Sequence, residues 1–261
     1  MSSSASSGPD YTVVTETPGT LVSRQAASMA ISRYEIARRL AVGRRVLEVA
    51  CGSGQGLGYV ARSAARVVGG DITAGLLAQA HARYRGAVPL VRFDAHALPF
   101  AAGSFDVVQI HEAIYYMARP QRVFEECRRV LSTDGVLIVS SINPAWADFN
   151  PSPFMAGYLG AGDLKTVLER PFRSVDILFG FEVPHRAAAG AAVSALKRLA
   201  VRLHLIPTTM RGKAMLKRLF LGPLLPVPAE ITADLGPVDE PRPAPLYESS
   251  HFRVIYAVAR P

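Results

Sequence analysis

The chain has 261 residues, of which 49% are hydrophobic and 19% charged, and its formal net charge is +8 at pH 7. This is the size and composition of one large globular domain, or of one domain with a substantial insertion. The two cysteines, Cys51 and Cys127, exclude a disulfide framework and favour a reducing, cytoplasmic compartment. Neither has a partner at metal-ligand spacing, so we expect no metal site.

Targeting and membrane segments are not expected. The N-terminal residues lack the basic and apolar regions of a signal peptide. No uninterrupted apolar run reaches the ~18 residues that span a bilayer. These observations also favour a cytoplasmic protein.

The positive charge is concentrated in one segment. Residues 183–229 contain eight Lys and Arg residues and no Asp or Glu, which leaves 29 − 8 = 21 basic and 21 acidic residues elsewhere. The segment is interpretable as a solvated amphipathic helix face, as a membrane-surface contact for a lipid-linked substrate, or as a site for an acidic small substrate. Nucleic-acid binding is least favoured, because no recognised RNA-binding module flanks the core.

The elements are predicted in chain order from hydrophobic periodicity. Residues 1–20 are expected to form a disordered tail. A helix is predicted over 21–43, where Met29, Ile36 and Leu40 share one face and Arg33 lies near it. Strand-like runs then alternate with helical periodicity. The predicted strands are 46–50, 67–71, 88–93, 105–111, 136–141 and 173–179, and the predicted helices are 57–64, 76–83, 121–131 and 161–169.

This alternation predicts an α/β fold with a mostly parallel sheet covered on both faces. Ligands of such sheets bind at the carboxyl ends of the strands. A final strand is predicted at 251–258, after about 70 residues that include a proline-rich stretch. We therefore divide the chain into the tail, a core over 21–182, a basic, Pro-rich, partly helical insertion or cap over 183–249, and a final core strand over 250–261.

Side chains suited to a nucleoside follow the first three predicted core strands. Glu48 ends the first strand, and Gly52, Gly54 and Gly56 then allow a tight turn and close approach of a ligand. The turn also aims the N–H groups of the next helix at that ligand. Asp71 ends the second strand, 71 − 54 = 17 positions after Gly54, where an acid accepts both hydroxyls of a ribose.

The third strand is followed by Asp94 and Ala95, where an adenine is expected. Each of these features alone is also explained by a plain turn or a helix cap. Their joint order and spacing are what favour a nucleoside site.

Together these motifs resemble class I S-adenosylmethionine (SAM)-dependent methyltransferases of the ubiquinone/menaquinone-biosynthesis type. The match covers about residues 44–142 and includes Gly70-Asp-Ile72, Asp94-Ala-x-x-Leu-Pro-Phe100, Ser104-Phe-Asp-Val-Val108 and Arg128-Arg-Val-Leu-x-x-x-Gly-Val-Leu137. The resemblance implies a Rossmann-like, doubly wound sheet of seven strands whose last strand is antiparallel. It also implies SAM as the cofactor.

The resemblance also implies roles for individual residues. Glu48 and the backbone of the glycine turn hold the methionyl end, Asp71 takes the ribose hydroxyls, and Ile72 packs on the adenine. Asp94 accepts from the adenine amino group, and the Ala95 N–H bonds a ring nitrogen. The complete expected cofactor set is Glu48, Ala50, Gly52, Gly54, Gln55, Asp71, Ile72, Asp94, Ala95 and His111.

A nicotinamide-dependent dehydrogenase is the alternative at the level of the fold. Its Gly-x-Gly-x-x-Gly fingerprint, started at Gly52, requires glycine where Leu57 stands. The carboxylate of Glu48, four residues before the first glycine, also disfavours a pyrophosphate. Both observations favour SAM.

The predicted function is transfer of a methyl group to a small molecule, with O-methylation of a glycan, lipid or secondary metabolite favoured. His111 and Tyr116 are the catalytic candidates, although the tyrosines could equally pack the pocket wall. The residues expected at the substrate are Tyr115, Tyr116, Trp146 and His185. The alternatives are an RNA-associated methyltransferase or binding protein, and a SAM-binding scaffold without catalysis. The oligomeric state is left open.

Overall fold

A computed structural model describes the chain apart from residues 1–9, 148, 150, 153 and 184–222. All eight basic residues of the segment 183–229 lie outside the described residues, as does His185. The predicted helical character of the insertion falls on the same stretch. The expectations for that segment therefore remain expectations.

The predicted helices and strands occur in the predicted order, and two short strands and two 3-10 turns that were not predicted add to them. The helices are α1 (Arg24–Leu40), α2 (Leu57–Ala61), α3 (Ala74–Tyr84), α4 (Pro120–Val130) and α5 (Ala161–Leu168), with 3-10 turns η1 (Ile114–Tyr116) and η2 (Leu246–His251). The strands are β1 (Leu21–Ser23), β2 (Arg45–Val49), β3 (Arg66–Asp71), β4 (Leu90–Arg92), β5 (Phe105–His111), β6 (Leu131–Ile142), β7 (Ser174–Glu182), β8 (Leu224–Pro226) and β9 (Phe252–Arg260).

The main sheet has seven strands in the order β4-β3-β2-β5-β6-β9-β7. The pairs from β4 to β6 are parallel, whereas β9 is antiparallel to both of its neighbours, β6 and β7. The predicted doubly wound α/β fold with an antiparallel final strand is therefore confirmed. Strands β1 and β8 form a separate antiparallel ribbon.

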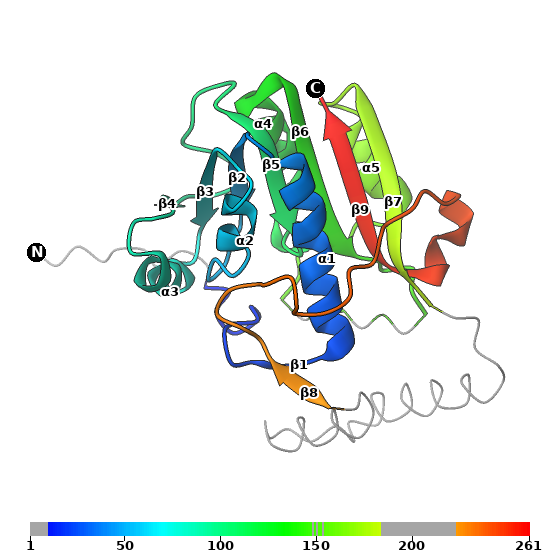
Figure 1. Cartoon of the computed structure of the whole chain (residues 1–261). Coiled ribbons are helices and arrows are strands. Elements are labelled where there is room, and N and C mark those ends of the chain that lie inside the picture. The colour runs from blue at the N-terminus through cyan, green and yellow to red at the C-terminus, as the bar shows by residue number, and fades with distance from the viewer. Residues whose placement is uncertain (1–9, 148, 150, 153, 184–222) are drawn as a thin grey trace, which may run out of the picture.

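Helices cover both faces of this sheet (Figure 1). One core lies between the sheet and α1, α2 and α3, and the other lies between the sheet and α4 and α5. The central strands are apolar on both sides, as parallel strands under two helical layers must be. In β2, for example, Val46, Leu47 and Val49 are all fully buried.

The N-terminal part of the described chain differs from expectation. The helix predicted over 21–43 begins at Arg24, because Ser23 Oγ accepts from the Ala26 N–H at 3.1 Å and caps it. Residues 10–20 form turns packed on the core instead of a free tail. The Tyr11 N–H donates to Thr73 Oγ1 at 3.3 Å, and the Gly19 N–H donates to the Val227 carbonyl at 2.9 Å.

No helix in the described part of the chain has the length and apolarity needed to cross a membrane. Among the same residues, no group of three or more His, Cys, Asp or Glu side chains is placed to hold a metal ion.

Asn143 fastens the end of β6 to the start of β9. Its side chain is fully buried, and Nδ2 donates to the carbonyls of Ser249 and Phe252 at 2.7 and 2.8 Å. Its Oδ1 accepts from the Ala145 N–H at 3.0 Å. The amide therefore satisfies three backbone groups where the two antiparallel strands meet.

A buried carboxylate joins the first helical layer to the sheet. Glu48 on β2 is 2% exposed, and its Oε1 accepts from the Tyr34 hydroxyl of α1 at 2.6 Å. Its Oε2 accepts from Gln109 Nε2 of β5 at 2.9 Å. Burial raises the pKa of Glu48 to about 7, although both hydrogen bonds oppose that shift.

We expect Asn143→Ala to lower the free energy of unfolding by about 2–4 kcal/mol, because it leaves buried carbonyls and an N–H without partners. Urea denaturation followed by far-UV circular dichroism measures the change. Gln121→Ala, at an exposed position of α4, is the control and should stay within about 0.5 kcal/mol of the wild type. Equal stabilities of Asn143→Ala and the control would contradict this assignment.

We also expect Glu48 to make stability depend on pH. Its pKa is about 7 in the fold against an ordinary value of 4.5, so between these values the folded state holds a proton that the unfolded state has lost. The unfolding free energy of the wild type should fall by about 3 kcal/mol from this group as pH rises from 4.5 to 7.

The measurement is urea denaturation at pH 5 and pH 8. Glu48→Gln should remove this part of the pH dependence, whereas Glu125→Gln, whose side chain is 44% exposed, should retain it. Parallel pH profiles for the wild type and Glu48→Gln would show that Glu48 does not titrate differently in the two states.

Candidate active site

A cavity of about 530 Å³ lies at the carboxyl ends of β2, β3, β4 and β5. Its volume is that of an ordinary small-molecule site. The four strand ends form its floor, and α1 forms one wall. Residues 11–16 and 227–235 supply further lining residues. The cavity is therefore enclosed by parts of the chain that are far apart in sequence.

The turn after β2 has the backbone conformation that the glycine spacing predicts. Gly52 and Gly54 have φ of 56° and 75°, in the left-handed region that glycine enters without strain. Ala50 has φ 60° without being glycine, which marks a conformation imposed by its surroundings. Gly56 is required by packing, since a Cβ there would lie 1.9 Å from Cε1 of Tyr34.

Helix α2, which follows this turn, is short. It spans five residues, and the Gly58 N–H donates to the Tyr84 hydroxyl at 2.9 Å. The Tyr84 hydroxyl in turn donates to the Gly54 carbonyl at 2.6 Å. The N–H groups of this helix were expected to point at a ligand. The N–H of Gly58 cannot bind one, because it already donates to Tyr84.

Asp71 connects the end of β3 to the glycine turn. Its side chain is buried, Oδ2 accepts from the Gly52 N–H at 2.9 Å, and Oδ1 accepts from the Thr73 N–H at 2.8 Å. A carboxylate has about four acceptor positions, so each oxygen retains capacity for a ligand hydroxyl. Asp71 and the neighbouring Ile72 both line the cavity.

Asp94 follows β4 and is tied to the next residues of its loop. Its Oδ1 accepts from the His96 N–H at 2.9 Å and lies 2.6 Å from His96 Nδ1. Burial acts to raise the pKa of Asp94, but the hydrogen bonds from His96 outweigh it and the pKa is lowered. Asp94 therefore presents an anionic edge at the cavity wall.

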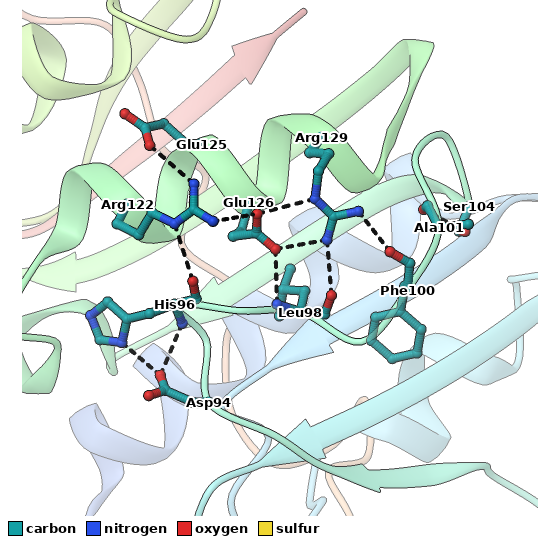
Figure 2. A network of polar contacts seen from close by, with 10 residues as sticks. All are labelled: Asp94, His96, Leu98, Phe100, Ala101, Ser104, Arg122, Glu125, Glu126 and Arg129. Carbon is teal, nitrogen blue, oxygen red and sulfur yellow. Dashed lines mark hydrogen bonds and ion pairs between the residues drawn. The ribbon is translucent and has the colours of Figure 1, made fainter.

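Charged side chains of α4 bind the backbone of the loop that carries Asp94 (Figure 2). Glu126 is 4% exposed, and its Oε2 accepts from the Leu98 N–H at 2.9 Å and from Arg129 at 2.7 Å. Arg129 also donates to the carbonyls of Leu98 and Phe100 at 2.9 and 2.7 Å. These bonds fix the path of the loop beside the cavity.

His111 ends β5 and is buried at the cavity wall. Its Nδ1 lies 2.9 Å from Ser140 Oγ, and its Nε2 has no hydrogen-bond partner among the described residues. Burial lowers the pKa of His111 to about 3, so the imidazole is neutral near pH 7. It offers a polar atom to a ligand without adding charge.

Glu112, the next residue, has φ 50° and faces Arg33 of α1. Arg33 Nη2 lies 3.8 Å from Glu112 Oε1. Oε2 of Glu112 accepts from the Tyr115 hydroxyl and from the Ile142 N–H, each at 3.2 Å. Burial raises the pKa of Glu112, an effect that Arg33 and these bonds only partly offset.

Aromatic rings form the side of the cavity beyond His111. The ring of Tyr116 lies 5.3 Å from that of Tyr11 and 4.6 Å from that of Tyr115, centroid to centroid. Tyr115 also contacts Tyr158 at 4.8 Å. This group suits the apolar body of an acceptor, with hydroxyls at its edges.

The structure brings most of the predicted site residues to one cavity. The predicted residues that line it are Ala50, Gly52, Gln55, Asp71, Ile72, Asp94, Ala95, His111, Tyr115 and Tyr116. Glu48 and Gly54 are not among the lining residues: both oxygens of Glu48 are used by Tyr34 and Gln109 beneath the turn. Trp146 does not line the cavity either, and its ring packs under the Arg253 guanidinium at 4.5 Å.

Other cavity residues were not anticipated. Arg33 lines the cavity. In the sequence, the one sign of this role is a charged residue close to the apolar face of a predicted helix. Tyr11 and Glu16 also line the cavity from a segment that we expected to be disordered. Nothing in their local sequence indicates this, because the contacts depend on the tertiary fold.

Comparison with known proteins bears on this site. Residues 47–139 match a family described as a methyltransferase domain. A probable S-adenosylmethionine-dependent methyltransferase of Mycolicibacterium smegmatis is 35% identical over 147 residues, covering 52% of this chain and 56% of the relative. A ubiquinone biosynthesis O-methyltransferase of Cereibacter sphaeroides is 33% identical over 122 residues, covering 46% and 47%.

A solved structure with the same fold is that of the [4+2]-cyclase SpnF. It has a TM-score of 0.55 and 23% sequence identity, and the alignment covers 90% of this chain and 82% of that one. At this identity the similarity concerns the fold alone. The chain spans about half the length of the curated relatives it matches.

The matched region contains the strand ends, the glycine turn and both loop acids that form the cavity floor. The sheet has the seven strands and the antiparallel last strand that the resemblance implies. Residues 47–139 are therefore similar to the methyltransferase domain found in S-adenosylmethionine-dependent methyltransferases.

Proposed function

We propose that this protein transfers a methyl group from SAM to an oxygen atom of a small molecule. The observation that carries the proposal is the single cavity in which Asp71 and the left-handed turn adjoin His111 and a group of tyrosines. A nucleoside and an acceptor can therefore lie side by side in one enclosure. O-Methylation is supported by the name of the Cereibacter relative, an O-methyltransferase.

The cofactor half of the cavity is assigned to the strand-end residues. Asp71 would take the ribose hydroxyls, and Ile72 would pack on the adenine, with Asp94 and the Ala95 N–H at its polar edge. The donor and acceptor types fit: the free lone pairs are on carboxylates, and the turn approaches closely because Gly52 lacks a side chain. Glu48 acts by holding Tyr34 and the turn in place.

SAM, when bound, supplies a methyl group on a sulfonium that is already activated for displacement. The protein's contribution is then alignment and exclusion of water. Residues 11–16 and 227–235 would exclude water, because both segments line the cavity away from the sheet. The Ile231 N–H donates to the Gln55 carbonyl at 2.9 Å, which links the second of these segments to the turn after β2.

The acceptor half is assigned to His111, Tyr115 and Tyr116. Tyr116 would orient the acceptor oxygen through its hydroxyl, and the neutral His111, a weak base because its pKa is lowered, would contact the acceptor through Nε2. Trp146 is set aside as an acceptor contact, since its ring is held by Arg253 outside the cavity. His185 lies outside the described residues.

The class of acceptor, whether a glycan, a lipid or a secondary metabolite, remains part of the proposal, as does cytoplasmic location. Membrane-surface contact and RNA binding both depend on the basic segment. Its charges lie outside the described residues, so no structural observation favours either.

We expect Asp71→Ala to weaken SAM binding by roughly 1–3 kcal/mol, or about 5- to 150-fold in Kd, through loss of a charged acceptor. Titration calorimetry with SAM measures it. Asp134→Ala removes an exposed carboxylate near the start of β6, at the end of the strand away from the cavity, and should leave Kd unchanged. An unchanged Kd for Asp71→Ala would overturn the ribose assignment.

We expect Tyr116→Phe to slow methyl transfer by about 3- to 10-fold, the effect of losing one orienting hydrogen bond. Transfer is measured with methyl-labelled SAM and panels of phenols, sugars, fatty acids and tRNA. Tyr247→Phe is the control, because Tyr247 is 83% exposed. Label entering tRNA in preference to every small molecule would contradict the proposal, as would SAM binding without any transfer.

A further inference from the structure

The cavity is lined by more negative than positive side chains. Besides the histidines, the charged groups on the described residues that line it are one guanidinium, on Arg33, and the carboxylates of Glu16, Asp71, Asp94 and Glu112. Arg33 Nη2 lies 3.8 Å from Glu112 Oε1, so these two charges offset each other. SAM brings a single net positive charge, because its ammonium and carboxylate cancel and its sulfonium remains. Negative charge therefore stays in excess when SAM is bound.

Glu16 is the carboxylate of this set that no described residue binds. Asp71 and Asp94 accept from backbone N–H groups and are assigned to the ribose and the adenine. In the described part of the chain, Glu16 makes no hydrogen bond, and no cationic nitrogen lies within 4.0 Å of its carboxylate. Its charge acts through space on Arg33 and Glu112. Glu16 therefore lies on the acceptor side of the cavity, near the carboxyl end of β5.

The segment that carries Glu16 is folded into a turn and fastened to the sheet. The Val14 N–H and the Thr15 Oγ1 hydroxyl donate to the Tyr11 carbonyl at 3.1 and 2.9 Å. The Tyr11 N–H in turn donates to Thr73 Oγ1, in the loop after β3, at 3.3 Å. These bonds hold Glu16 and the ring of Tyr11 in one short turn, and both residues line the cavity.

Two tyrosine rings accompany this carboxylate. The rings of Tyr11 and Tyr116 lie 5.3 Å apart, centroid to centroid, and are tilted by 47° instead of stacked. Both tyrosines line the cavity and are only partly buried. The face of a tyrosine ring carries negative potential and attracts ammonium groups. A carboxylate beside such rings is complementary to a cation and repels an anion.

A buried polar atom in the same half of the cavity also lacks a protein partner. His111 is 7% exposed, and its Nε2 makes no hydrogen bond to any described residue. A buried nitrogen of this kind calls for a ligand group or a water. The imidazole is neutral, so it supplies no positive charge for an anionic acceptor. With Arg33 offset by Glu112, the acceptor half has a carboxylate, ring faces and a neutral polar atom to offer.

We infer that the acceptor molecule carries a positively charged amino group, which Glu16 and the rings of Tyr11 and Tyr116 bind. The inference rests on the proposed function. The amino group is an anchor and not the methylated group, because a protonated amine has no lone pair to attack a sulfonium. A hydroxyl oxygen of the same molecule bonds to the methyl carbon as the carbon–sulfur bond breaks, and its proton passes to water. The substrate class is thus a small amino alcohol, amino sugar or phenolic amine.

The test compares probes that differ in one charged group, by calorimetry with S-adenosylhomocysteine present at saturation. One series is tyramine, tyrosol and 4-hydroxyphenylacetate, and the other is glucosamine, glucose and glucuronate. In at least one series we expect the wild type to bind the amine about 10-fold more tightly than the neutral compound, and the carboxylate most weakly. Glu16→Gln should reduce the preference for the amine to about 2-fold or less. Tyr11→Leu should weaken amine binding by about 2- to 5-fold, whereas Tyr11→Phe should retain it.

Two further measurements separate the outcomes. Glu125→Gln, on α4 with a side chain that is 44% exposed, is the matched control and should prefer the amine as the wild type does. S-Adenosylhomocysteine should bind the wild type, Glu16→Gln and Glu125→Gln equally, which also shows that each is folded. If it fails to bind the wild type, the proposed function is at fault. If it binds but neither series shows a preference for the amine, or the preference survives in Glu16→Gln, the inference is overturned.

Discussion

The hydrogen bonds to the buried carboxylate of Glu48 connect the three elements on which the site depends. Tyr34 reaches it from α1 and Gln109 reaches it from β5, directly beneath the turn that follows β2. The position of the Tyr34 ring then explains Gly56, since any side chain there would overlap that ring. It also fixes the rotation of α1, and with it the direction of the next residue, Arg33. One buried interaction thus sets both the turn after β2 and the direction of a charged residue that lines the cavity.

A second charged group performs a similar task on the other side of the sheet. Glu126 and Arg129 bind backbone atoms of Leu98 and Phe100, so α4 determines the path of the loop that carries Asp94. Glu126 is nearly inaccessible to solvent, yet each of its oxygens accepts from an arginine. Such pairing is what makes a buried charge tolerable. The Leu-Pro-Phe motif, which does not line the cavity, is explained by this attachment.

The sequence predicted the core well because its signals are local. Apolar runs, glycine spacing and acids at strand ends identify β2, β3 and β5 and the residues Asp71 and His111 without knowledge of tertiary contacts. The residues that were missed depend on long-range packing. Tyr11 reaches Thr73 across 62 positions, and Arg33 is a cavity residue only because α1 crosses the sheet. Trp146 was misplaced for the same reason, since its partner Arg253 lies on the last strand.

The place of β9 in the sheet has a consequence for synthesis of the chain. This strand is the last in sequence, yet it lies between β6 and β7. A nascent chain on the ribosome therefore has two unpaired strand edges facing one gap until residues 252–260 have emerged. Such edges are templates for pairing with other chains. The sheet can close only after translation of its final strand. A chain that is released before this point therefore exposes two unpaired strand edges and is prone to aggregate.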